Sequence, residues 1–92
     1  MSLHSDQLDR AWAKLGMEIK GGRDVRALFF YRGRLILQTR RSRGRGAIEG
    51  LIPTFIRQQM KLTENQFGEL LACPLGLAGY LEILGQKKLL PQ

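Results

Sequence analysis

The sequence predicts a small α+β domain in which a three-stranded antiparallel sheet follows one helix and precedes three more. Helical periodicity at both ends, a central run of strand residues interrupted by Arg32-Gly33, and a length of 92 residues support this class. The expected order is α-β-β-β-α-α-α, with the helices packed on one face of the sheet. Residues 1–92 would form a single domain: helix, hairpin and basic loop over 6–50, then the C-terminal helices over 51–90.

The first helix is expected to run from Asp6 to Leu15, with Ser5 as its N-cap and Gly16 at its end. A short strand should follow over residues 17–20, and Gly21-Gly22 should form a turn. The first helix has an apolar face formed by Leu8, Ala11, Trp12 and Leu15.

Residues 25–41 predict a β-hairpin with Arg32-Gly33 as its two-residue turn. This turn would place Phe30 opposite Leu35 and Leu28 opposite Leu37, and we expect those four residues to face the core. The opposite face also carries large apolar residues, interleaved with arginines, and core packing and partner binding are both open for them. These candidate interface residues are Phe29, Tyr31 and Ile36.

Three helices are expected after a glycine-rich basic loop at residues 42–50. The first covers residues 51–61. Residues 63–66 form a capping-box signature that opens the second, which Pro74 ends, and the third covers residues 75–84. The helix over 51–61 has an apolar stripe formed by Leu51, Ile52, Phe55, Ile56 and Met60.

The net charge of +7 is concentrated in one segment. Residues 20–46 carry nine basic residues against Asp24 alone, and eight of the nine are arginine. Because arginine binds phosphate bidentately and stacks on bases, this segment favours nucleic-acid or other polyanion binding over a merely solvated face. The candidate nucleic-acid-binding residues are Lys20, Arg23, Arg26, Arg40, Arg41, Arg43 and Arg45.

Cysteine and histidine each occur once, as Cys73 and His4. A single cysteine excludes an intrachain disulfide and a Cys-cluster zinc site, and a lone histidine makes a His-based metal site implausible. We therefore expect no metal and no cofactor. The chain has no apolar run long enough for a membrane span and no signal-peptide core, so a cytoplasmic location is expected.

Two segments resemble a known family. Residues 51–71, LIPTFIRQQMKLTENQFGELL, resemble the C-terminal signature of the HicA family of mRNA interferase toxins, and residues 38–44 resemble its third strand and the exit into a basic loop. The helix–meander–helix order also resembles the double-stranded-RNA-binding-like fold. The resemblance implies an RNA-binding domain of toxin–antitoxin type, acting on double-stranded or structured RNA.

The sequence departs from that family at the catalytic position. HicA toxins carry a histidine at the start of the second strand, whereas the matching residues 21–26 contain none. Asp24 as a base and Arg26 as a phosphorane stabiliser are the remaining candidates, but an exposed aspartate is a poor proton shuttle near neutral pH. The catalytic residues are thus unassigned, and we expect RNA binding with weak or no ribonuclease activity.

Two other functions are considered. The first is a protein-interaction module, in which the candidate interface forms a homodimer or docks an acidic, antitoxin-like partner. The second is a Cro-type helix-turn-helix over residues 55–84 that binds DNA. Its recognition helix would offer base edges only Tyr80 and Glu82, which makes this function less favoured. The sequence does not distinguish between RNA and DNA as the ligand.

Overall fold

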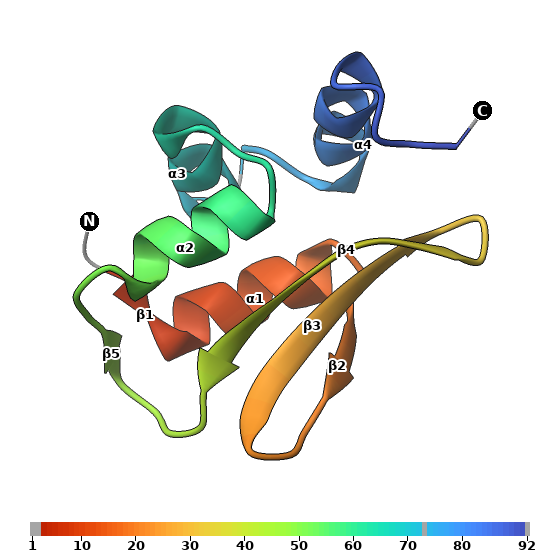
Figure 1. Ribbon diagram of the computed structural model, residues 1–92. Helices are drawn as coiled ribbons and strands as arrows, with labels where there is room; N and C mark the ends of the chain where they lie inside the picture. The colour runs from red at the N-terminus through yellow and green to blue at the C-terminus, as the bar shows by residue number, and fades with distance from the viewer. Residues whose placement is uncertain (1–2, 73, 92) are drawn as a thin grey trace.

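The computed structural model describes residues 3–72 and 74–91 (Figure 1). It confirms the α+β class and the expected order of the main elements, and adds two short strands, β1 and β5, that were not expected. The elements are β1 (Leu3–His4), α1 (Ser5–Lys14), β2 (Glu18–Lys20), β3 (Asp24–Tyr31), β4 (Arg34–Ser42), β5 (Ala47–Ile48), α2 (Ile52–Gln59), α3 (Glu64–Ala72) and α4 (Leu77–Gln86).

The larger sheet has the antiparallel order β2-β3-β4, and β1 pairs with β5 in a separate two-stranded sheet. The helices lie to one side of the larger sheet, with α2 above β4 (Figure 1). The buried residues of the helices and of this face of the sheet form one hydrophobic cluster. In the part of the chain that the structure describes, the opposite face, here called the outer face, carries no helix.

The β3–β4 hairpin has the predicted turn but a different register beyond it. Arg32 and Gly33 both have positive φ, 52° and 78°, as a two-residue hairpin turn requires. Phe30 pairs with Leu35 as predicted, but Phe29, not Leu28, pairs with Leu37. The bulge leaves one extra residue in β4, and such an insertion changes which side chains share a face.

The structure overturns one prediction and decides between the two uses that the sequence left open for Phe29. Phe30 and Leu35, expected in the core, are 42% and 43% exposed. Phe29, expected as a candidate interface residue, is only 2% exposed and packs edge-to-face on Tyr80 with ring centroids 5.1 Å apart. The core therefore takes Phe29, and a partner has no access to it in this structure.

The core contains three large, fully buried aromatic side chains from the helices α1, α3 and α4, namely Trp12, Phe67 and Tyr80. The Tyr80 hydroxyl donates to the Met60 carbonyl oxygen at 2.8 Å, and burial raises the pKa of this phenol well above its ordinary value. Tyr80 is thus turned into the core, so the α4 surface does not offer it to base edges as the helix-turn-helix alternative requires.

The observed ends of the helices agree in part with the ends predicted from the sequence. The capping box of α3 is confirmed, since the Thr63 hydroxyl accepts from the Gln66 N–H at 3.2 Å and the Gln66 side chain accepts from the Thr63 N–H at 3.0 Å. α4 starts at Leu77 and continues to Gln86, two residues beyond its expected end at Leu84. Within residues 3–72 and 74–91, none of the helices is long and apolar enough to cross a membrane.

Candidate nucleic-acid interface

Three basic residues lie side by side on the outer face of the sheet. Lys20 of β2 pairs with Arg26 of β3, which pairs with Arg40 of β4. Ala27 and Thr39, the neighbours of the two arginines along their strands, are buried, so alternation directs Arg26 and Arg40 away from the core. We call Lys20, Arg26 and Arg40 the cationic row; all three are exposed.

The cationic row is unfavourable for folding by itself. Like charges directly opposite one another on adjacent strands destabilise a sheet. Asp24 offsets little of this repulsion, because its Oδ2 is as far as 3.8 Å from Arg40 Nη1 and the Arg40 side chain is 69% exposed. An anionic ligand lying across the three strands would relieve the repulsion, and the row is therefore the strongest candidate for a binding site.

Two further arginines lie at the same end of the sheet. Arg23 is in the β2–β3 turn and Arg43 is in the β4–β5 loop, and both segments are at the lower end of the sheet in Figure 1. A Cβ added to Gly21 would lie 3.0 Å from Arg43 Nη2, so this guanidinium extends over the turn. Together with the cationic row, Arg23 and Arg43 form what we call the cationic end.

Arg45 and the hairpin arginines lie outside the cationic end. Arg45 is exposed further along the β4–β5 loop, where it and Arg43 line a pocket of about 220 Å³. At the opposite end of the strands, Arg32 lies in the hairpin turn and Arg34 begins β4. The Arg32 guanidinium lies 5.2 Å from the centre of the Tyr31 ring. Tyr31 and Ile36, the other two candidate interface residues, are half-buried in β3 and β4.

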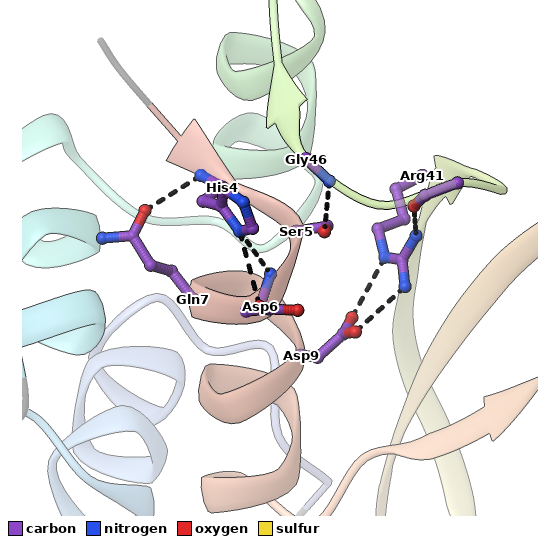
Figure 2. Close-up of polar contacts among 8 residues, drawn as sticks. His4, Ser5, Asp6, Gln7, Asp9, Arg41 and Gly46 are labelled. Carbon is purple, nitrogen blue, oxygen red and sulfur yellow. Dashed lines mark hydrogen bonds and ion pairs between the residues drawn. The ribbon is translucent and has the colours of Figure 1, made fainter.

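Arg41 has a structural role and is not free to bind phosphate. Its side chain is only 10% exposed. Its Nε and Nη2 donate to the two carboxylate oxygens of Asp9 at 3.0 Å (Figure 2). Its Nη1 donates to the carbonyl oxygens of Ser42 and Gly44, also at 3.0 Å. Of the candidate nucleic-acid-binding residues, Arg41 is thus already bound to protein groups: it joins α1 to the end of β4 and holds the start of the basic loop.

The end of the basic loop is also fixed. The Gly46 N–H donates to the Ser5 hydroxyl at 3.1 Å (Figure 2). The Ser5 N–H donates in turn to the Gly46 carbonyl oxygen at 2.9 Å. Gly44 and Gly46 both have a φ of 121°, a backbone conformation that residues other than glycine rarely adopt. The Ser5 hydroxyl thus accepts a hydrogen bond from the basic loop and does not cap the helix. Ser5 is the first residue of α1, and not its N-cap as predicted.

His4 takes the capping role and lies beside the basic loop. Its Nδ1 accepts from the Asp6 N–H at 3.1 Å, and its own N–H donates to Gln7 Oε1 at 2.9 Å (Figure 2). His4 pairs with Ala47 in the β1–β5 sheet, a placement that no local sequence signal indicates. Because Nδ1 is used as a hydrogen-bond acceptor, we assign His4 a structural role.

Comparisons of the chain with models of protein families, with curated proteins and with solved structures find no match.

Removing the Arg41 side chain is expected to loosen the basic loop. Arg41→Ala should lower the free energy of unfolding by about 2 kcal/mol, the usual size for lost hydrogen bonds to a charged group. Urea unfolding measures this change, and trypsin cleavage after Arg43 and Arg45 should become faster. The matched control is Arg34→Ala, which removes an exposed arginine from the hairpin turn. An unchanged urea midpoint for Arg41→Ala would contradict the structural role.

Proposed function

We propose that this protein is a small RNA-binding domain that contacts the sugar–phosphate backbone through its cationic end. The observation that carries the proposal is the cationic row, in which Lys20, Arg26 and Arg40 are in register on three adjacent strands. Neighbouring strands are about 4.8 Å apart, so the row presents positive charge across roughly 10 Å of an open sheet face. Arg23 and Arg43 extend this charge toward the end of the sheet.

The choice of RNA is supported by the resemblance to HicA toxins and to double-stranded-RNA-binding-like domains. Side chains reach A-form RNA mainly through its phosphates and 2′-hydroxyls, so contacts from an arginine-rich face would recognise structured RNA with little dependence on sequence. The proposal is one of binding and not of cleavage. Asp24, the candidate base, lies beside Arg40, and His4 caps α1.

The salt dependence of binding tests this proposal. If about four of the five residues of the cationic end neutralise phosphates, log K should fall against log salt with a slope of roughly −3 to −4. Fluorescence anisotropy with a labelled RNA hairpin, over about 50 to 200 mM salt, measures the slope. A flat salt dependence, or no binding at the low end of this range, would overturn the proposal. A DNA duplex of the same length, run in parallel, separates RNA from DNA binding.

Association with a second copy or an acidic partner is the second candidate function. The observation in its favour is the exposed pair Phe30 and Leu35 on adjacent strands, since Phe29 is buried. Exposed apolar residues of this kind mark protein contacts when they form a continuous patch. Light scattering, which measures the oligomeric state of the free protein, tests a homodimer directly.

A further inference from the structure

A groove lies between β4 and α2, directly beside the cationic row. It consists of two adjoining pockets of about 240 and 300 Å³, which share Arg40 and Gln59. The side chain of Arg26 also lines the larger pocket. The groove, here called the β4–α2 groove, is lined on its strand side by Arg40 and Ser42, and on its helix side by Ile52, Phe55 and Gln59.

The helix side of the groove presents an aromatic ring to solvent. The expected apolar stripe of α2 is divided: Ile56 and Met60 are buried in the core, whereas Ile52 and Phe55 are 42% and 49% exposed. Residues 52, 55 and 59 recur at helical spacing, and all three line the same pocket. Phe55 is therefore a half-exposed ring in a pocket that Arg40 also lines.

Polar groups near the ring are held in place. The Thr39 hydroxyl donates to Gln59 Oε1 at 2.7 Å, and Thr39 itself is buried, so the Gln59 amide has a defined position at the edge of the groove. The amide NH₂ group of Gln59 and the hydroxyl of Ser42 are hydrogen-bonding groups of the kind that contact base edges.

We infer that the β4–α2 groove takes an unpaired nucleobase of the bound RNA, stacked on Phe55. The inference rests on the proposed RNA-binding function and narrows its ligand from structured RNA in general to structured RNA with an unpaired nucleotide. A nucleotide combines an apolar base face with a charged phosphate, and the groove offers a counterpart to each. The exposed Phe55 ring and Arg40 line one of its pockets, and Arg26 lines the adjoining pocket. Asp24 is the one carboxylate on its lining and lies beside Arg40.

An acidic peptide is the competing occupant. It would satisfy the arginines but would not require a flat, half-exposed ring. Bases of every kind stack on aromatic side chains, because each has a π-face, and arginines commonly hold the adjacent backbone. The combination of ring and arginines in one groove thus favours the nucleotide.

Phe55→Ala tests the inference with two RNA probes. One is a hairpin that carries the fluorescent base 2-aminopurine in its single-stranded loop, and the other is a blunt duplex of equal length. The wild-type protein should bind the hairpin more tightly and quench its fluorescence. Phe55→Ala should weaken hairpin binding by about five- to a hundredfold, the range for loss of one stacked base, and leave duplex binding unchanged.

Two variants serve as controls. Phe55→Trp keeps an aromatic surface and should retain both hairpin binding and quenching. Leu51→Ala removes another exposed apolar side chain, 68% exposed, from the start of α2 and outside the groove lining, and should behave like the wild type. Because Phe55 is half-exposed, thermal unfolding followed by circular dichroism should show Phe55→Ala to be folded.

The outcomes separate the two proposals. If the wild type binds neither RNA, the proposed function fails and the inference fails with it. If it binds both RNAs and Phe55→Ala changes neither affinity, RNA binding stands and the groove is not a base site. If Phe55→Ala changes the oligomeric state by light scattering but not hairpin binding, the groove is a protein contact, which also overturns the inference.

Discussion

Reversing two charges of the cationic row, Arg26→Glu together with Arg40→Glu, is expected to lower RNA affinity by about a hundredfold to ten-thousandfold. The expected loss corresponds to two charge-assisted hydrogen bonds of about 1.5–3 kcal/mol each. Both side chains are exposed on the outer face, so the variant should remain folded. Fluorescence anisotropy at about 100 mM salt measures the affinity, and circular dichroism verifies the fold.

The hairpin turn supplies a matched control for this experiment. Arg32→Glu with Arg34→Glu makes the same change in net charge, but at the other end of β3 and β4. Its effect on affinity should be several-fold at most, because charges more than about 10 Å from the ligand are largely screened at this salt concentration. Equal losses for the two double variants would show that net charge alone attracts RNA and that the cationic row has no special role.

Phe29→Asp is expected to unfold the protein. Phe29 is 2% exposed and packs on the buried Tyr80, so the change removes apolar contacts and places a carboxylate in the core. The cost should exceed about 4 kcal/mol, most of the stability of a small domain. Circular dichroism and thermal unfolding would show the loss of the cooperative transition.

The adjacent residue provides the control for Phe29. Phe30 is 42% exposed on the outer face, so Phe30→Asp should change the free energy of unfolding by less than about 1 kcal/mol. The comparison tests directly which of these two neighbouring β3 residues faces the core. A folded Phe29→Asp beside an unfolded Phe30→Asp would show that the register described here is wrong.

Local sequence signals predicted most of the elements. The turn at Arg32-Gly33 and the capping box at Thr63 and Gln66 depend on residues close together in the chain, and both are present. The bulge was missed because β3 and β4 carry large apolar residues on both faces, so the alternation of side chains does not reveal one extra residue. The β1–β5 pair was missed because strands of two residues have no measurable periodicity.

The candidate site was predicted as a set of residues but not as an arrangement. Composition identifies the arginines of residues 20–46, whereas the alignment of Lys20, Arg26 and Arg40 depends on strand register. The structural role of Arg41 depends on Asp9, which is 32 residues away in the chain and lies on a helix. The exposure of Phe55 could not be predicted from helical periodicity either. An apolar stripe shows which residues share one side of a helix, but not how many of them the core covers.

The fixed ends of the basic loop have a consequence for the thermodynamics of binding. Arg41 holds the loop where it leaves β4, and the Ser5–Gly46 hydrogen bonds hold it where β5 begins. A flexible loop would lose backbone entropy when it closes on a ligand, which weakens the complex. Here that entropy is lost when the protein folds, so the proposed RNA binding would have only to order the arginine side chains.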